Sequence, residues 1–365
     1  MRFTAKNIPC NSCGASMVYS PKEAKLVCDF CYSTVDIPLG RAVISEDYHN
    51  AIHSHPMLDE ENYSGEVIQK EVTCKKCNAS FNLHQKSFAD ICPYCQTPVM
   101  IDCIQDITPH GLLPFLITQK EAQKKFKIWV GSRWFAPNAF KEYLNESKKL
   151  IGYYFPYWSY DTRTITRYEG ERGDRYYVTV SKVVMVNGKE ERRDVQESRV
   201  DWSYRSGMVE VSFDDVTIGA SNTIERSRLD EIEPWSCEGI QPFNLNYISG
   251  FKAEEYDVEI KDGFSLAKDK MKPIIESRIR RDIGGDEQRI DNMQIQYNNI
   301  TYKNLLFPVW IASFKWNKKE YEYAVNGRTG KVVGDRPYSY IKIAFAIISA
   351  LAIAGAIYYY NGLQS

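Results

Sequence analysis

Eight cysteines in the first 95 residues have the spacing of metal ligands. They form four Cys-x-x-Cys pairs, which are Cys10 and Cys13, Cys28 and Cys31, Cys74 and Cys77, and Cys92 and Cys95. Two thiolates that lie two residues apart fit on one tight turn, and a short hairpin can bring two such turns together. Four sulfurs in a tetrahedron, about 2.3 Å from the metal, are a ligand set of structural Zn²⁺. The spacing therefore predicts two zinc ribbons that bind two zinc ions.

The two cysteine-rich segments are copies of one unit. In each segment the second pair begins 18 positions after the first, and Cys13-Gly14-Ala15-Ser16 corresponds to Cys77-Asn78-Ala79-Ser80. Four cysteines leave no coordination position for water, so we expect structural rather than catalytic sites. Zinc binding contributes on the order of 10–16 kcal/mol in zinc-finger peptides. A ribbon of about 30 residues needs that contribution, because it buries too little apolar surface to fold alone.

Other uses of these cysteines stay open. Disulfides are one, although the N-terminus has no apolar stretch typical of a secretory signal, and reduced thiolates indicate the cytosol. Cys92-Pro93-Tyr94-Cys95 alone could be a redox motif, and four cysteines could hold an iron–sulfur cluster. Zinc is favoured because the pairs occur twice at matched distance. Cys103 and Cys237 stand apart, and we interpret them as small buried apolar side chains.

The whole chain predicts a multidomain α+β protein. Its 365 residues favour two or three domains, and its net charge of −1 disfavours a general nucleic-acid binder. The predicted segments are zinc ribbon 1 over 1–38, a connector over 39–70, zinc ribbon 2 over 71–103, a short helical segment over 104–150, a β-rich domain with one long amphipathic helix over 151–335, and a transmembrane anchor with a short tail over 336–365. His49, His53 and His55 lie in the connector, which we interpret as polar surface because both ribbons already have four ligands.

The helical segment should contain two helices. Thr118 and Glu121 form a capping-box pattern at the start of the first helix, and the second is predicted from Asn138 to Leu150. The first helix is rich in lysine, at Lys120, Lys124, Lys125 and Lys127. These lysines are either a phosphate-binding face or the solvated side of an amphipathic helix, and we favour the second interpretation.

The β-rich domain contains two similar segments, Tyr154–Trp158 and Leu306–Trp310, each with a central proline. We predict that both start strands and that these strands pair, because proline is tolerated at the beginning of a strand. Asn187-Gly188 and Asn326-Gly327 predict two-residue type I′ hairpin turns. Ser265–Ile283 predicts one amphipathic helix with basic flanks, which could lie on an anionic membrane but is expected to pack on the sheet.

Ile341–Tyr360 predicts a transmembrane helix. Twenty residues at about 1.5 Å each span roughly the 30 Å of a bilayer's hydrocarbon core. Lys342 is the only charge in this stretch, and tyrosines flank both ends. Basic residues precede the span, at Arg328, Lys331 and Arg336, and no charged side chain follows it. The positive-inside rule therefore predicts a single-pass protein of the cell membrane with its N-terminal bulk in the cytoplasm.

Catalytic motifs are absent from the sequence. It contains no G-x-x-x-x-G-K-[ST], no H-E-x-x-H and no G-x-S-x-G. The five histidines, including His84 and His110, lie outside the β-rich domain, and the adjacent pair Asp214-Asp215 is interpreted as a turn. We therefore expect a protein that is not an enzyme, with a hydrolase in the β-rich domain as a distant alternative.

The order of these features resembles a bacterial family of membrane-anchored double zinc-ribbon proteins. The resemblance rests on the paired cysteine motifs and on the later segments Leu112–Phe115, Arg133–Pro137, Tyr154–Asp161 and Asn326–Pro337, followed by a terminal span. Members are often labelled helicases of the primosomal protein N′ type, although this chain lacks a phosphate-binding loop. Similar proteins in Firmicutes are encoded beside a phage-shock protein A homologue and an SPFH-domain, virion-core-like protein. The resemblance implies these two as partners.

Together these features predict a non-enzymatic, membrane-tethered adaptor or scaffold that recruits cytosolic proteins, in a membrane-stress or SPFH-protein system. The alternative is a zinc-ribbon protein that binds nucleic acid at the membrane in replication or phage functions. It is supported by Lys75 and Lys76, which lie inside one Cys-x-x-Cys pair.

Overall fold

The computed structural model describes residues 2–38, 40–54, 70–83, 86–101, 108–146, 150–186 and 189–363. The predictions made for Cys103, for His55 and His84 and for the Asn187-Gly188 turn lie outside these residues. More of the described chain is strand than helix, and the strands form one eleven-stranded sheet and two three-stranded sheets. Two four-cysteine clusters lie near the N-terminus, a sheet-rich body follows, and one apolar helix ends the chain, in keeping with the expected multidomain α+β organisation.

The elements have the following bounds. The strands are β1 (Arg2–Thr4), β2 (Met17–Ser20), β3 (Lys25–Cys28), β4 (Thr34–Val35), β5 (Glu46–Asp47), β6 (Lys70–Thr73), β7 (Ser80–Leu83), β8 (Ser87–Ile91), β9 (Pro98–Met100), β10 (Gly111–Leu112), β11 (Ile151–Val186), β12 (Lys189–Gly219), β13 (Gln241–Pro242), β14 (Lys252–Glu254), β15 (Glu287–Trp316), β16 (Lys319–Asn326) and β17 (Val332–Gly334). The helices are α1 (Tyr48–Ser54), α2 (Gln119–Gly131), α3 (Asn138–Glu146), α4 (Arg226–Glu231), α5 (Leu245–Ile248), α6 (Ile260–Ile283) and α7 (Tyr340–Leu363).

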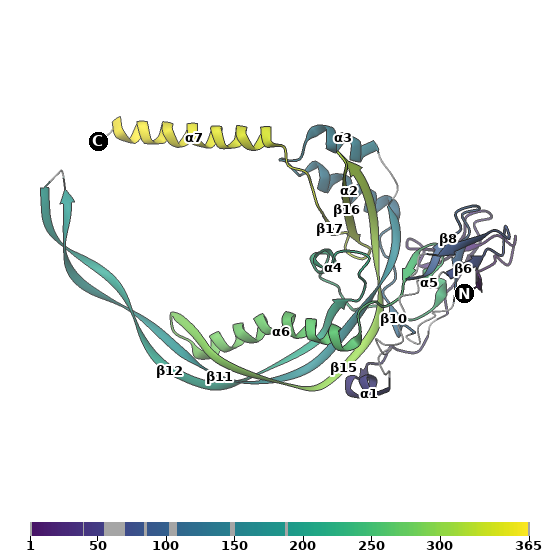
Figure 1. Ribbon diagram of the computed structural model, residues 1–365, viewed down its shortest axis with the longest axis horizontal. Helices are drawn as coiled ribbons and strands as arrows, with labels where there is room; N and C mark the ends of the chain where they lie inside the picture. Colours follow the sequence, from purple (N-terminus) through teal and green to yellow (C-terminus); the bar gives the residue numbers. More distant parts are fainter. Residues whose placement is uncertain are drawn as a thin grey trace.

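Three long antiparallel strands form the body, with β11 between β12 and β15. Alternate side chains of β11 are buried from Thr162 to Tyr168, as expected for a strand with one covered face. β15 pairs with β11 only as far as Gly173, and beyond it β11 and β12 continue as a two-stranded ribbon. We call this ribbon, residues 174–186 and 189–201, the arm. Figure 1 shows the arm reaching far from the body, past the end of α6.

Helix α6 packs across the three long strands, which confirms that its apolar stripe faces the sheet. Met271, Ile275 and Ile279 are fully buried against β11, β12 and β15, whereas Ile274 is 53% exposed. The helix begins at Ile260, five residues before the predicted start. The reason is tertiary: Trp158 donates its indole N–H to the Val258 carbonyl at 2.8 Å and holds the chain against the sheet where the helix begins.

The segments Tyr154–Trp158 and Leu306–Trp310 pair as predicted, with Phe155 directly opposite Phe307. The prediction that both start strands is wrong for the second, because β15 begins 21 residues before Pro308. The carbonyl of Pro156 accepts from the Ala220 amide, just past β12, and that of Pro308 accepts from the Gly327 amide, just past β16. In an antiparallel strand the N–H and C=O groups of one residue point to the same neighbouring strand. The N–H that each proline lacks would therefore point to a strand that has already ended, so no ladder hydrogen bond is lost.

The predicted two-residue turn at Asn326-Gly327 is wrong. Val325 pairs with Val332, so a longer loop joins β16 and β17, and Asn326 still belongs to the strand. The residue with positive φ is Gly330, at 74°. Gly327 is required for another reason: a Cβ there would lie 2.6 Å from the ring of Phe115 and 2.7 Å from the Pro308 oxygen.

The helical segment packs on β16. Thr118 and Glu121 form the predicted capping box of α2, and Phe126 of α2 stacks on Phe314 and meets Tyr323 edge-on. Helix α3 begins at Asn138, as predicted, and its described residues run to Glu146. The lysine-rich side of α2 is exposed at Lys124, which agrees with a solvated face.

Helix α7 is long and apolar enough to cross a membrane, and none of its span is buried in the protein. Figure 1 shows α7 and the arm leaving the body in the same general direction.

Candidate metal centres

The four Cys-x-x-Cys turns share one backbone conformation. In each turn the carbonyl of the first cysteine accepts from the amide four residues on, and its amide donates to the carbonyl five residues on. The residue after the second cysteine has positive φ; these residues are Gly14 at 74°, Tyr32 at 59°, Asn78 at 55° and Gln96 at 58°. Residues other than glycine rarely adopt this conformation, so the surrounding structure must impose it on Tyr32, Asn78 and Gln96. The shared geometry supports the internal duplication.

The four turns converge in two pairs, and all eight predicted ligands lie in the two clusters. Ribbon 1 brings Cys10, Cys13, Cys28 and Cys31 together, and ribbon 2 brings Cys74, Cys77, Cys92 and Cys95 together. Within each cluster the ligand atoms lie within 4.8 Å of one another. Zinc at about 2.3 Å from four tetrahedral sulfurs places those sulfurs about 3.8 Å apart.

The sulfur separations in both ribbons fit that requirement. Cys10 and Cys31 lie 3.5 Å apart and Cys13 and Cys28 3.6 Å apart in ribbon 1. The corresponding separations in ribbon 2 are 3.7 Å, between Cys74 and Cys95, and 3.8 Å, between Cys77 and Cys92. All are far longer than a disulfide bond of about 2.05 Å. The clusters are therefore compatible with two zinc ions, each closed by four sulfurs.

Hydroxyl groups of Ser33 and Thr97 lie beside the sulfurs. Ser33 Oγ is 3.0 Å from Cys10 Sγ and 3.1 Å from Cys31 Sγ, and Thr97 Oγ1 is 3.3 Å from Cys95 Sγ. The Ser33 hydroxyl and nearby amides lower the pKa of Cys10 to about 6. For Cys95, desolvation opposes the change, but hydrogen bonds from Thr97 prevail and its pKa falls to about 6. The two hydroxyls favour the thiolate that a metal requires.

The pKa values of Cys13 and Cys77, the second cysteine of each ribbon, shift in the opposite direction. The amide of Ala15 lowers the pKa of Cys13, but desolvation and the three neighbouring thiols outweigh it, and the pKa rises to about 12. Cys77 is raised to about 12 for the same reasons, with Ala79 in the place of Ala15. Four thiolates cannot coexist at this distance without a cation between them, so each cluster needs a cation to become fully ionised.

Ribbon 2 is continuous with the main sheet. Its strand β8 pairs with β14, which in turn pairs with β11. Lys70 of β6 donates to Glu255 at 2.7 Å, and both side chains are buried. The N-terminal strand β1 belongs to the ribbon 1 segment but pairs with β6 of ribbon 2, so the two ribbons are linked.

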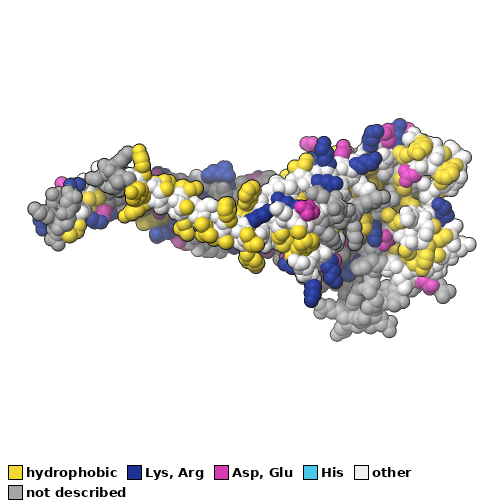
Figure 2. All heavy atoms as spheres, turned by 90° about the horizontal axis from the view of Figure 1, so that it is seen from above, with side chains coloured by type: hydrophobic (Ala, Val, Ile, Leu, Met, Phe, Trp, Pro, Cys, Tyr) yellow, Lys and Arg dark blue, Asp and Glu magenta, His cyan; other side chains and the backbone are white. Residues whose placement is uncertain are grey.

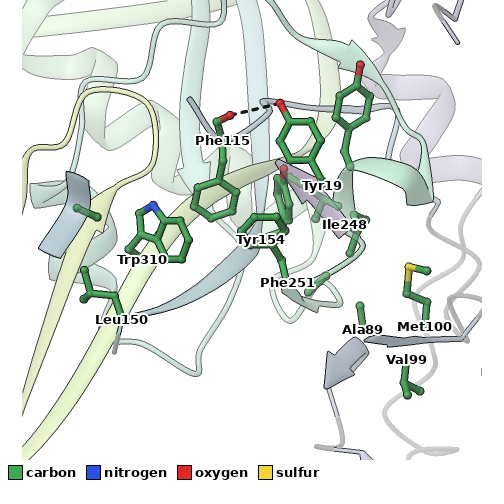
Figure 3. Close-up of a cluster of buried hydrophobic side chains, with 14 of the residues drawn as sticks. Tyr19, Ala89, Val99, Met100, Phe115, Leu150, Tyr154, Ile248, Phe251 and Trp310 are labelled. Atoms are coloured by element: carbon green, nitrogen blue, oxygen red, sulfur yellow. Dashed lines mark hydrogen bonds between the residues drawn. The ribbon is translucent and has the colours of Figure 1, made fainter. Parts of the chain in front are cut away.

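Ribbon 1 docks through Tyr19. Its hydroxyl donates to the Phe115 carbonyl at 3.4 Å, and its ring meets Tyr247 edge-on at 5.3 Å. Figure 3 shows Tyr19 between Phe115, Tyr154 and Ile248 in the core that ribbon residues share with the body. Both cysteine clusters are thus fixed relative to the sheet, because their hairpins contribute to one hydrophobic core.

Large aromatic side chains lie exposed on the cysteine turns. Phe30 is 80% exposed and Tyr94 68% exposed, and each immediately precedes the last cysteine of its ribbon. Tyr32, after Cys31, is 78% exposed. Sequence reasoning missed this shared position, as it missed Ser33 and Thr97; all become visible once the two copies are aligned on their cysteines.

A cluster of acidic groups contains Asp161, Asp214 and Asp215. The predicted turn at Asp214-Asp215 is a β-bulge inside β12, where Asp215 has a φ of 53°. Lys303 donates to Asp215 at 2.6 Å and lies 3.5 Å from Asp161. Desolvation raises the pKa of Asp215, but the Lys303 hydrogen bond outweighs it and lowers the value. The lysine thus supplies the positive charge that these carboxylates need.

The single cysteine and the histidines form no further centre among the described residues. Cys237 is half-buried, and burial together with Asp215 raises its pKa to about 12, which keeps it a neutral thiol. His49 is exposed on α1, and His110 lies 3.4 Å from Glu46. Burial lowers the pKa of His110 despite Glu46, and its Nδ1 faces the Asn304 amide.

Comparison with known proteins gives one informative similarity. A protein of Bacillus subtilis (strain 168) named "Uncharacterized protein YdjG" is 28% identical over 247 residues. The match covers 65% of this chain and 66% of YdjG, so it spans just under two thirds of that relative's length. No family model and no solved structure matches the chain.

Proposed function

We propose that this protein is a membrane-tethered zinc-ribbon adaptor, not an enzyme, that recruits cytosolic proteins to a membrane. Its two zinc ions are structural, since four sulfurs close each cluster and leave no position for a substrate. α7 is the tether, and the basic residues before it favour a cytoplasmic location of the ribbons and the sheet by the positive-inside rule. A reducing compartment also suits eight free thiols.

The exposed aromatics on the cysteine turns carry the proposal. Phe30 and Tyr94 occupy equivalent positions on two turns that metal and backbone hydrogen bonds hold rigid. Aromatic side chains supply much of the binding energy of protein interfaces, and a rigid support lowers the entropy lost on binding. The resemblance to membrane-anchored double zinc-ribbon proteins points to an SPFH-domain, virion-core-like partner or a phage-shock protein A-like one.

The tether constrains the arm. The arm carries charged residues on its strands, such as Lys182, Arg199 and Glu197, which require water. Because α7 and the arm extend in the same general direction, an inserted helix has to lean away from the arm. The arm then lies over the cytoplasmic face of the membrane, where it offers a second surface for partners.

Affinity purification of the full chain from detergent-solubilised membranes tests the adaptor. We expect a stoichiometric partner with the wild type, and its loss with Phe30→Ser/Tyr94→Ser at unchanged zinc content. The matched control is Tyr204→Ser/Met208→Ser, which removes two large exposed side chains from β12 outside the arm. A protein that purifies alone contradicts the adaptor, and equal partner recovery with both variants contradicts the ribbon surface.

Nucleic-acid binding is the second candidate, and one observation favours it. Lys75 and Lys76 are exposed in the same ribbon as Tyr94, and lysines beside an exposed aromatic suit a single strand with stacked bases. DNA or RNA binding that weakens steeply with salt, and that Lys75→Gln/Lys76→Gln reduces, would support this function. Absence of binding at low salt would reject it.

A further inference from the structure

Four positively charged side chains converge where α7 leaves the body. Arg133 follows α2, Lys141 lies on α3, and Arg336 and Lys342 flank the start of α7. All four are half-buried. Figure 2 shows Lys and Arg side chains gathered where the apolar helix joins the body. We call these four residues the basic cluster.

The basic cluster makes its described contacts with carbonyl groups, an amide oxygen and aromatic rings rather than carboxylates. Lys342 Nζ donates to the Trp134 and Ala136 carbonyls and to Asn138 Oδ1, at 3.2, 2.9 and 2.7 Å. These bonds hold the first turn of α7 against the loop between α2 and α3. Lys141 Nζ donates to the Gly131 carbonyl at 3.0 Å and keeps two further N–H groups.

Each arginine of the basic cluster has its guanidinium group beside an aromatic ring. The Arg133 guanidinium lies 4.4 Å from the centre of the Trp129 ring, and that of Arg336 lies 5.2 Å from the Tyr338 ring. Arg133 Nε is buried and has no hydrogen-bond partner within the described part of the chain. Desolvation and Arg336 together lower the pKa of Arg133. Desolvation, Lys342 and Arg336 lower that of Lys141.

Half-buried like charges repel one another, and an anion between them would remove that cost. Phosphate suits this set best, because guanidinium groups bind it in a bidentate manner and an ammonium adds a compact charge. Trp134, Tyr338 and Tyr340 lie beside the cluster and are 69%, 54% and 85% exposed. Exposed tryptophan and tyrosine at the end of an apolar helix are typical of the headgroup layer.

We propose that Arg133, Lys141 and Arg336 bind the phosphate group of an anionic phospholipid, while Lys342 positions the helix. This inference rests on the proposed membrane tether, because α7 brings the basic cluster to the depth of the headgroups. The site selects the membrane leaflet or region richest in acidic lipid. It also fixes the body at the membrane surface more firmly than one helix can.

Lipid retention by the full chain in nanodiscs tests the site. The probes are phosphatidylcholine alone and phosphatidylcholine mixed with phosphatidylglycerol, and native mass spectrometry counts the lipid that stays bound. We expect selective retention of phosphatidylglycerol by the wild type. Arg133→Gln/Lys141→Gln/Arg336→Gln should weaken it about a hundredfold, because one cation near a membrane surface contributes about fivefold. Zinc content reports folding, and Lys141→Gln/Arg336→Gln replaces the triple variant if that variant fails to fold.

The matched control removes three charges from the exposed side of α2, as Lys120→Gln/Lys124→Gln/Lys127→Gln. We expect it to retain phosphatidylglycerol to within about threefold of the wild type, since salt screens charges beyond about 8 Å. An equal loss in both variants overturns a defined site in favour of diffuse attraction. Displacement of lipid by inorganic phosphate at equal concentration overturns the lipid in favour of a soluble phosphate. A chain that enters neither kind of nanodisc refutes the tether itself, which is a separate outcome.

Discussion

Lys70 and Glu255 form a buried ion pair between ribbon 2 and the body. Lys70 Nζ lies 2.7 Å from Glu255 Oε2, and the two side chains are 4% and 7% exposed. The Glu255 amide also donates to the Lys86 carbonyl beside β8. These two residues lie 185 positions apart in the sequence, and their ion pair joins ribbon 2 to the body. Specific contacts therefore hold ribbon 2 against the body.

Replacing Lys70 with methionine should destabilise this junction by about 3–5 kcal/mol, because it removes the cation from a buried carboxylate. Denaturant unfolding in detergent, followed by tryptophan fluorescence, measures the change. Lys70→Met/Glu255→Gln should recover part of the loss, since no charge is then left buried. A single variant as stable as the wild type would show that the pair contributes nothing.

Zinc binding should release protons from Cys13 and Cys77. Both have a pKa of about 12, so both are protonated near neutral pH and must lose a proton to bind metal. Zinc affinity should therefore increase with pH. It should fall more steeply below the pKa of about 6 shared by Cys10 and Cys95, because these thiolates then protonate as well. Chelator competition across this pH range measures the slope, and a pH-independent affinity would contradict the prediction.

Ser33→Ala/Thr97→Val should lower zinc affinity by about ten- to a hundredfold, the usual effect of losing a group that supports a metal ligand. The hydroxyls bond to Cys10, Cys31 and Cys95, and without them the thiol pKa values rise. Ser80→Ala is the control, because its hydroxyl contacts Thr73 instead of a sulfur. Chelator competition compares the three proteins, and equal loss in the control would assign the effect to ribbon folding.

The cysteine clusters and the start of α2 were accessible to sequence reasoning because their signals are local. Cysteine spacing predicts the clusters, and the Thr118–Glu121 pair predicts the start of α2. The apolar run before the C-terminus predicts a helix able to cross a membrane, although its place in a cell is a proposal. In each case the physics acts within a few turns of chain.

Features set by distant contacts were not predictable. The pairing of Ala89 with Ala253 makes ribbon 2 part of the main sheet, and no periodicity in either strand indicates it. The arm gives no clear alternation, because both its faces are exposed and neither needs an apolar pattern. Positive φ at Tyr32 and Gln96 was equally hidden, since such residues adopt it only when their surroundings impose it.

Backbone amides of the arm should exchange with solvent much faster than those of the three-stranded part of the same strands. Two strands without a third strand or a packed helix are marginally stable in water. Thr166 and Val209, by contrast, are buried where β15 and α6 cover the hairpin. Hydrogen exchange of the purified full chain should separate the two regions near Gly173. Equal protection on both sides of that point would mean that the arm is covered, for example by a second copy.

Gly263→Ala should destabilise the protein by about 1–3 kcal/mol even though alanine favours helix, because α6 touches the sheet at that glycine. An added Cβ would lie 2.5 Å from the Tyr160 hydroxyl and 2.7 Å from Trp158 Cδ1. Gly131→Ala is the matched control in α2, since a Cβ there meets nothing within 4 Å and should stabilise the protein by up to about 1 kcal/mol. Denaturant unfolding of both variants measures the difference. If the Gly263→Ala variant is as stable as the Gly131→Ala variant, α6 does not lie as close to Trp158 as the 2.7 Å contact implies.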